Sequence, residues 1–276
     1  MAQIGKLNRL TVVKKVDFGV YLDGLHLDNI LLPKRYVPED TEIGDELEVF
    51  IYLDSEDFLI ATTETPDVMV GECAYLRVVD VNNAGAFLDW GLPKDLLVPY
   101  NEQHKPMEVD RSYVVHVSLD EYTDRIVASS KLNRHLEEKS FDFEPLEEVD
   151  LLVCGRSDMG YKVIINHTHL GLIFKDDAFK PLRFGKQLKG YIKNIRPDGK
   201  INVMLQLPAS QGRDELSEKI LEHLRMNGGV STLIDKSAPE DIYHLFNVSK
   251  KNYKKALGSL YKAKKIDIGK TEIKLL

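Results

Sequence analysis

VDFGVYLDG, residues 16–24, and NILLP, residues 29–33, decide how the N-terminal part of this chain folds. In these stretches an alternating apolar strand reaches Gly19, a short strand follows, and a third apolar strand comes after a polar connection. A glycine inside a strand usually marks a bulge or a sharp bend at the corner of a barrel. Five short strands in roughly 60–70 residues, with one such bend, are typical of a small closed Greek-key barrel of the OB type.

The closing pair of strands of this barrel is predicted to begin with ELEVFIYL, residues 46–53. Its apolar residues alternate with a period of two, so one face carries Leu47, Val49, Ile51 and Leu53. A period of two indicates a strand with one buried and one solvated face. We therefore expect a half-buried strand here.

The same order of elements recurs twice along the chain. NNAGAFLDWG (residues 82–91) followed by DLLVP (residues 95–99) repeats the pattern closely, and SDMGYKVII (residues 157–165) followed by GLIFKDD (residues 171–177) repeats it in a more divergent form. Self-similarity of this kind predicts tandem copies of one structural unit.

Residues 209–276 change to a helical period. Three helices are predicted: one before the NGG stretch at residues 227–229, one that starts at Pro239, and one capped by Ser249. The apolar face of the third helix is predicted to hold Tyr253, Ala256, Leu257, Leu260 and Tyr261. The tail KIDIGKTEIKLL, residues 265–276, predicts a β-hairpin. Three helices and a hairpin make a winged helix.

The expected fold is mainly β with a C-terminal α+β domain, namely three tandem five-stranded OB-type barrels followed by a winged helix. The expected domains are residues 1–66, 67–140, 141–208 and 209–276. The formal net charge is −7, yet the charge is uneven: residues 1–66 carry 6 Lys and Arg against 13 Asp and Glu, whereas residues 209–276 carry 13 against 9. Only a local basic patch can therefore attract an anionic partner.

Several classes of protein find little support in the sequence. No phosphate-binding loop, nucleophile elbow or metal-ligand spacing is present, so we expect neither an enzyme nor a cofactor. Cys73 and Cys154 are expected to be buried apolar residues, and His167 and His169 to be exposed loop residues. No apolar run approaches the ~20 residues of a membrane span, and no signal pattern opens the chain, which favours a cytoplasmic location.

The first two repeats resemble the ribosomal S1-type RNA-binding domain, whose pattern is an aromatic-Gly-x-aromatic step followed by a Gly-Leu-x-His segment. The histidine of that family is replaced here by Leu32, Val98 and Phe174. Three such barrels followed by a winged helix resemble the bacterial conserved virulence factor B family over essentially the whole chain, most specifically in SKKNYKKALGSLYKAKKI, residues 249–266. The resemblance implies a cytoplasmic, non-enzymatic RNA-binding regulator.

The third helix of the C-terminal domain carries a stripe of lysines on its solvent face. At roughly 100° per residue the stripe holds Lys251, Lys254, Lys255, Lys262 and Lys265, with no acidic residue among them. Like charges at this spacing destabilise a helix by a few tenths of a kcal/mol each, so the stripe favours contact with phosphates. A solvated face and docking on an acidic protein surface, including the chain's own N-terminal barrels, remain the alternatives.

The barrels offer a second set of candidate RNA-binding residues. OB-type faces stack bases on exposed aromatic rings, and the rings in question are Phe18, Tyr21, Phe87, Trp90, Tyr161 and Phe174. Each ring is also a candidate core residue, and the chain must bend at Gly19 for Phe18 and Tyr21 to face one ligand. The candidate contacts to the RNA backbone are Arg125, Lys186, Lys189, Lys193 and Lys200. The main RNA path is expected over the third barrel and the winged helix.

The sequence thus predicts a protein that binds single-stranded RNA with modest sequence preference and regulates gene expression after transcription. One alternative is a scaffold that binds a protein partner, associated with the ribosome or with RNA polymerase, through its acidic barrels. Another is a transcription regulator that binds duplex DNA through the winged helix, but lysines position a nucleic-acid backbone and seldom read its sequence. Duplex DNA is therefore the less favoured partner, and no membrane partner is expected.

Overall fold

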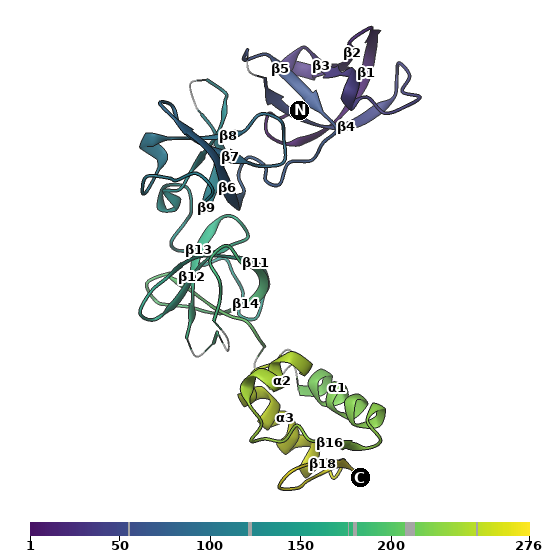
Figure 1. Cartoon of the computed structure of the whole chain (residues 1–276), viewed down its shortest axis with the longest axis vertical. Coiled ribbons are helices and arrows are strands. Elements are labelled where there is room, and N and C mark those ends of the chain that lie inside the picture. The colour runs from purple at the N-terminus through teal and green to yellow at the C-terminus, as the bar shows by residue number, and fades with distance from the viewer. Residues whose placement is uncertain (55, 121–122, 176, 179–180, 208–212, 247) are drawn as a thin grey trace.

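The computed structural model describes residues 1–54, 56–120, 123–175, 177–178, 181–207, 213–246 and 248–276. Over these residues the chain forms three closed five-stranded barrels and a C-terminal domain of helices with a three-stranded sheet. The four units follow one another along the longest axis of the molecule (Figure 1). The predicted fold class is confirmed, whereas the expected boundary between residues 208 and 209 lies outside the described residues.

The three barrels share one strand order, in which the first three strands are followed by the fifth and then the fourth. Barrel 1 consists of β1 (Leu7–Val16), β2 (Gly19–Asp23), β3 (Asn29–Pro33), β4 (Glu46–Leu53) and β5 (Leu59–Thr62). Barrel 2 consists of β6 (Cys73–Asn82), β7 (Gly85–Asp89), β8 (Leu96–Pro99), β9 (Ser112–Leu119) and β10 (Ile126–Ser129). Barrel 3 consists of β11 (Glu148–Arg156), β12 (Gly160–Ile165), β13 (His169–Phe174), β14 (Gln187–Ile195) and β15 (Ile201–Met204).

Each barrel bends at the same place. The first strand carries a bulge against the second, between Val12 and Lys14 in barrel 1, with counterparts in barrels 2 and 3. The second strand begins at Gly19, where an added Cβ would overlap the carbonyl oxygen of Leu32, and both later barrels repeat this approach. Glycine is needed there because the third strand passes so close.

The C-terminal domain packs three helices against a small sheet. The helices are α1 (Arg213–Met226), α2 (Pro239–Phe246) and α3 (Lys250–Lys262), and the strands are β16 (Val230–Ser231), β17 (Ile266–Ile268) and β18 (Ile273–Leu275). Ser249 caps α3, as predicted, because its side chain accepts a hydrogen bond from the Asn252 amide. Tyr253 lies in the core, but Tyr261 is 53% exposed, so the prediction that Tyr261 belongs to the apolar face is wrong.

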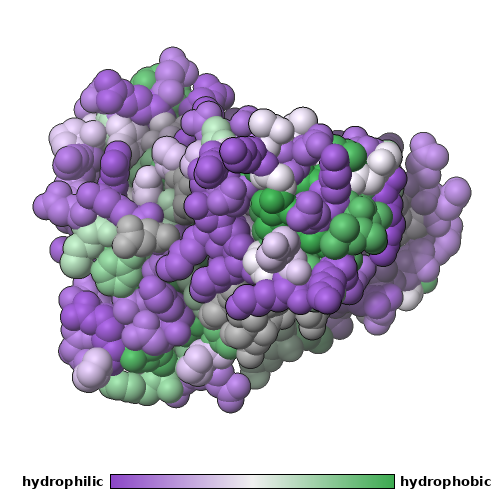
Figure 2. Space-filling model, turned by 90° about the horizontal axis from the view of Figure 1, so that it is seen from below, coloured by the Kyte–Doolittle hydropathy of each residue, from purple (hydrophilic) through white to green (hydrophobic). Residues whose placement is uncertain are grey.

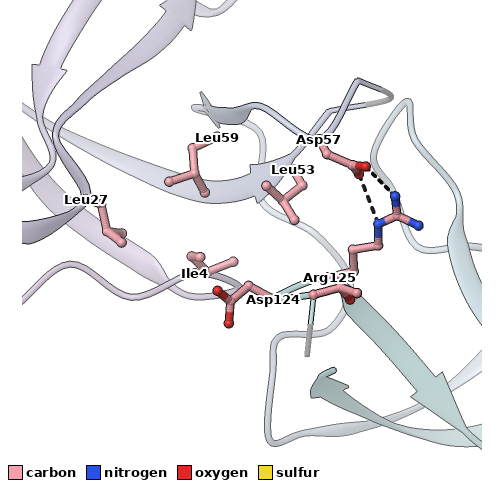
Figure 3. Close-up of a pocket in the computed structure, with 8 residues that line it drawn as sticks. Ile4, Leu27, Leu53, Asp57, Leu59, Asp124 and Arg125 are labelled. Atoms are coloured by element: carbon pink, nitrogen blue, oxygen red, sulfur yellow. Dashed lines mark hydrogen bonds and ion pairs between the residues drawn. The ribbon is translucent and has the colours of Figure 1, made fainter. Parts of the chain in front are cut away.

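Barrels 1 and 2 share a hydrophobic core. Phe50 and Tyr52 project from β4 into the core of barrel 2, where the ring centroid of Phe50 lies 5.7 Å from that of Trp90. The strand β4 is therefore buried on both faces over residues 49–52, the second half of the strand apart from its last residue, and the prediction of a strand with one solvated face is wrong there. An ion pair between Asp57 and Arg125 also joins the two barrels (Figure 3).

Barrels 2 and 3 meet through a second apolar cluster, in which Cys73 and Val114 pack against Leu152 and Ile164. Cys73 is buried as predicted, and burial raises the pKa of its thiol to about 12, whereas Cys154 is only half-buried. Nδ1 of His167 accepts a hydrogen bond from the backbone amide of Cys73 at 3.0 Å. His167 therefore lies in a turn, as predicted, but it is half-buried at this junction rather than exposed. His169 is half-buried in β13, so its prediction as an exposed loop residue is wrong.

Candidate nucleic-acid interface

The strand register of barrel 1 aligns Lys14, Tyr21, Leu31 and Ile60 in one row across its outer face. Phe18 is 58% exposed beside this row, and its ring centroid lies 6.5 Å from that of Tyr21, with the rings at 83°. The bend at Gly19 thus brings both rings to one surface. This arrangement is required if both rings are to stack on the bases of one strand. Barrel 1 therefore presents two accessible rings next to a lysine.

The corresponding row of barrel 2 is Asp80, Phe87, Leu97 and Val127. Phe87 is half-buried at the position of Tyr21, but an aspartate replaces the lysine. The pKa of the nearby Asp95 carboxyl is raised by its partial burial and then by the charges of Asp89 and Asp80. Carboxylates crowded in this way repel a phosphate backbone, so this face of barrel 2 is poorly suited to hold one.

The row of barrel 3 is Gly155, Lys162, Leu172 and Asn202. Lys162 takes the place of Tyr21 and Phe87, and sequence reasoning missed it. Tyr161 is 8% exposed and lies in the core of the barrel, so its assignment as a stacking residue is wrong. Lys162 could have been identified by its spacing from the glycine that begins the second strand of the barrel. In every barrel the residue directly after this glycine points inward and the next one points outward.

The same register corrects the position that corresponds to the family's histidine. Leu32 pairs with Val20 and Val98 pairs with Ala86, whereas Ile173 pairs with the equivalent Tyr161. Ile173 rather than Phe174 therefore occupies that position in barrel 3. The position is buried and apolar in every barrel, so it contributes no hydrogen bond to a ligand.

Trp90 was expected to be a stacking residue, and this prediction is wrong. The side chain is 2% exposed, and its Nε1 donates a hydrogen bond to the carbonyl oxygen of Lys94 at 2.6 Å. Its ring packs against Phe50 of barrel 1. Trp90 joins two barrels and has no surface left for a base.

Phe174 is half-buried at the end of β13, and Nζ of Lys193 lies 5.9 Å from its ring centroid. A cation over an aromatic ring is a favourable arrangement. The pair places an aromatic surface and a positive charge together at the rim of barrel 3. Of the four basic candidates on this barrel, however, Lys189 pairs with Asp150 at 2.8 Å and Lys193 with Asp177 at 2.7 Å.

The remaining two basic candidates of barrel 3, Lys186 and Lys200, are exposed, and neither has an acidic partner within the part of the chain that the structure describes. Arg125 of barrel 2 differs from them. Its guanidinium forms two hydrogen bonds with the carboxylate of Asp57, which hold the pKa of that carboxyl below its usual value. We therefore assign Arg125 to the junction between barrels 1 and 2 rather than to RNA.

Four lysines of the predicted stripe, Lys251, Lys254, Lys255 and Lys262, are exposed on α3, and Lys265 follows the end of the helix. Two members of the stripe have acidic neighbours from other elements: Lys254 lies 3.9 Å from Asp235, and Lys265 lies 3.9 Å from Glu218. Pairs this long between exposed groups contribute little. Figure 2 views the molecule from this end and shows a mainly hydrophilic surface.

The other three lysines of the stripe, Lys251, Lys255 and Lys262, form no ion pair with any described residue. Lys251 also lies in the first turn of α3, which has no acidic residue. A cation near a helix N-terminus is unfavourable by about 0.3–1 kcal/mol. At the centre of the stripe, Gly258 has open space where a Cβ would be. The stripe is therefore accessible and is not arranged for helix stability.

Asn252 is the one amide side chain of α3, and it faces barrel 3. Its Nδ2 donates to Oε1 of Gln206 at 2.9 Å, and the backbone amide of Ser249 donates to the same oxygen at 3.0 Å. Gln206 follows the last strand of barrel 3. These two bonds connect the start of α3 to the segment that follows barrel 3, and the first one occupies the Asn252 amide that would otherwise be available to read a base.

Within the described ranges, no group of three or more His, Cys, Asp or Glu side chains could hold a metal ion. Among the same residues, no helix has the length and apolar character to cross a membrane.

These features define a class: a chain of S1-type barrels with a winged-helix domain. Residues 4–64 and 70–131 match the S1 domain family, and residues 218–275 match the CvfB-like winged helix domain. Both are families of binding domains rather than enzyme families, and S1 domains bind nucleic acids. The chain belongs to the conserved virulence factor B family.

The chain is similar to several individual proteins. The uncharacterized protein YitL of Bacillus subtilis is 33% identical over 95% of this chain and 90% of its own length. Conserved virulence factor B of Staphylococcus saprophyticus is 27% identical over 99% of this chain and 94% of its own length. A solved structure described as a multidomain protein with nucleic acid binding domains, from Streptococcus pneumoniae, is 24% identical, with a TM-score of 0.42 over 99% of this chain and 98% of that one.

Proposed function

We propose that this protein binds single-stranded RNA through barrel 3 and α3, and that it regulates gene expression after transcription in a bacterial cytoplasm. The observation that supports this most concerns three lysines of the stripe. They are exposed and have no acidic partner among the described residues: Lys251, Lys255 and Lys262. Unneutralised lysines along one helix face suit a phosphate backbone.

Barrel 3 supplies the second part of the binding surface. Lys162, Lys186 and Lys200 offer positive charge, and Phe174 offers a partly exposed ring. Stacking a base on such a ring contributes about 1–3 kcal/mol. Since Gln206 connects α3 to the segment that follows this barrel, an RNA bound at one surface raises the effective concentration of the strand at the other.

Duplex DNA is a poorer fit for this surface. Base reading in a major groove relies on bidentate contacts from Arg, Asn or Gln, and the amide of Asn252 is already bonded to Gln206. Lysines contact the backbone without reading the sequence. We therefore expect modest sequence preference and a preference for flexible single strands.

The test is fluorescence anisotropy of labelled single-stranded RNA, single-stranded DNA and duplex DNA of matched sequence, at physiological salt. The full chain is compared with a variant in which Lys251, Lys254, Lys255, Lys262 and Lys265 are all changed to Gln. We expect RNA to bind tightest and the variant to lose at least tenfold in affinity. Tighter binding of duplex DNA would favour a transcription regulator, and no binding of any of the three would favour a protein scaffold.

A further inference from the structure

A pocket of about 370 Å³ lies where barrel 1 meets barrel 2. Four aliphatic side chains of barrel 1 line it, and Figure 3 shows them around one hollow: Ile4, Leu27, Leu53 and Leu59. All four are half-buried in the chain as it stands. The volume lies at the low end of the range of about 300–1,000 Å³ for ligand sites, which is enough for one or two aliphatic side chains.

The side of the pocket that belongs to barrel 2 is polar. Figure 3 shows the carboxylate of Asp124 beside Ile4, while the guanidinium of Arg125 turns away toward Asp57. The carboxylate of Asp124 has no ion-pair partner among the residues described. An apolar floor thus meets a negative charge that nothing in the described chain neutralises.

The surroundings of the pocket are acidic as well. The two turns that frame it, before β5 and before β10, carry Asp54, Glu56, Asp57, Asp120 and Asp124. The basic groups at the junction are both engaged, since Arg125 bonds to Asp57 and Nζ of Lys94 donates to the carbonyl oxygen of Leu53 at 2.9 Å. Residues 1–140 as a whole carry 14 Lys and Arg against 26 Asp and Glu. The acids beside the pocket and the net negative charge of the two barrels therefore both attract cations.

We propose that this pocket docks a peptide segment of a partner protein, in which one or two leucine-sized side chains are flanked by Lys or Arg. The aliphatic side chains fill the hollow, and the flanking cations meet Asp124 and the acids of the two turns. An RNA strand does not suit the site, because carboxylates repel phosphates and the described residues of the lining include no aromatic ring on which a base could stack. The docking surface is thus separate from the proposed RNA surface on barrel 3 and α3.

The test uses the full chain and a fluorescein-labelled peptide of sequence GKKGLLGKKG, with two control peptides in which the leucines become serine or the lysines become glutamate. The protein variant combines Leu27→Ala with Asp124→Asn. Asp124 has a positive φ of 54°, which asparagine tolerates. The matched control combines Leu25→Ala with Asp40→Asn, two residues of barrel 1 outside the lining, of which Asp40 has a φ of 63°.

We expect the leucine peptide to bind at least fivefold tighter than either control peptide. The Leu27→Ala, Asp124→Asn variant should bind it at least fivefold more weakly than the unaltered chain, and the matched control variant should bind it as the unaltered chain does. Equal binding of the serine peptide, equal binding by the two variants, or no binding at all would overturn the inference.

The same proteins, titrated with labelled RNA, separate this inference from the proposed function. RNA affinity should be unchanged by the Leu27→Ala, Asp124→Asn substitutions. If this variant loses peptide binding and keeps RNA binding, both the docking inference and the proposed function stand. If the unaltered chain binds RNA but not the peptide, only the docking inference fails. If the unaltered chain binds the peptide but not RNA, only the proposed function fails.

Discussion

Nδ2 of Asn252 donates a hydrogen bond to Oε1 of Gln206 at 2.9 Å, and this contact ties the first turn of α3 to the end of barrel 3. The same oxygen accepts from the backbone amide of Ser249. One glutamine therefore connects the start of α3, which carries the lysine stripe, to the segment that follows the last strand of barrel 3.

Gln206→Ala should loosen this connection without unfolding either domain. Each lost hydrogen bond removes about 1 kcal/mol, and the RNA affinity should fall about threefold because the two surfaces no longer hold one strand in a fixed geometry. Anisotropy with labelled RNA measures the change, with Gln3→Ala in barrel 1 as the control. An affinity equal to that of the control would mean that the orientation of α3 is irrelevant to binding.

Changing Lys251, Lys255 and Lys262 together to Gln should flatten the salt dependence of RNA binding. Each phosphate contact contributes about 0.7 to the slope of log K against log salt for a single strand, so the slope should fall by about 2. Titrations between low and moderate salt measure it. The control changes Lys34, Lys105 and Lys139, which are exposed residues of the first two barrels and the segment after them. An equal loss of slope in the control would indicate general charge attraction only.

Gly258→Ala should stabilise the C-terminal domain. Nothing lies within 4 Å of the position of the added Cβ, and alanine is more favourable than glycine in a helix by about 1 kcal/mol. Urea unfolding followed by far-UV circular dichroism measures the gain. Gly190→Ala offers the contrast, because its Cβ would overlap the side chain of Leu151 in barrel 3 and should destabilise that barrel. A loss of stability for Gly258→Ala would contradict the open surface described for α3.

Trp90→Ala should cost about 3–5 kcal/mol of unfolding free energy, the usual range for a buried aromatic side chain. Phe87→Ala, on the half-buried outer face of the same barrel, should cost much less. Calorimetry of both variants gives the comparison, and the Trp90 variant should also separate the unfolding of barrels 1 and 2. A small effect of Trp90→Ala would restore its candidacy as an exposed stacking residue.

The junction between barrels 2 and 3 should weaken in acid. Burial, then the charges of His135 and His167, lower the pKa of His116 from 6.5 to about 4, and its ring stacks on that of His135 at 4.7 Å. A lowered pKa in the folded state means that the unfolded chain takes up the proton first. Stability from this group is complete above pH 6.5 and is lost as the pH falls toward 4, with about 2 kcal/mol lost by pH 5.

Urea midpoints at pH 7 and pH 5 measure the loss of stability in acid for the natural chain and for the His116→Gln variant. The loss should be smaller in the variant. The exposed His104→Gln in barrel 2 should behave as the natural chain does. An identical pH dependence in His116→Gln would assign the acid sensitivity to other groups.

Local sequence patterns were sufficient to predict the barrels and the winged helix, because each strand and helix repeats a period that depends on its own residues. They failed where a second unit covers a surface. ELEVFIYL alternates as a half-buried strand does, yet Phe50 and Tyr52 on its other face are buried by barrel 2. Trp90 was misassigned for the same reason, since its pocket is built partly by another barrel.

The candidate site was predictable only in part. The lysines of α3 follow from helical spacing alone, and their exposure agrees with it. Lys162 could have been found by counting two residues from Gly160, as Tyr21 is counted from Gly19. The hydrogen bond between Asn252 and Gln206 could not have been predicted. Gln206 lies 46 residues earlier in the chain, and no local pattern joins the two.

The aromatic pair that β4 contributes to the neighbouring barrel has a consequence for stability. A gene fragment that encoded residues 1–66 alone would yield a domain with Phe50 and Tyr52 bare on its surface, and the next fragment would lack part of its own interior. Each fragment alone would lose apolar contacts that the pair has. The first two barrels are therefore expected to act as one unit of stability, although the sequence repeats its pattern once for each barrel.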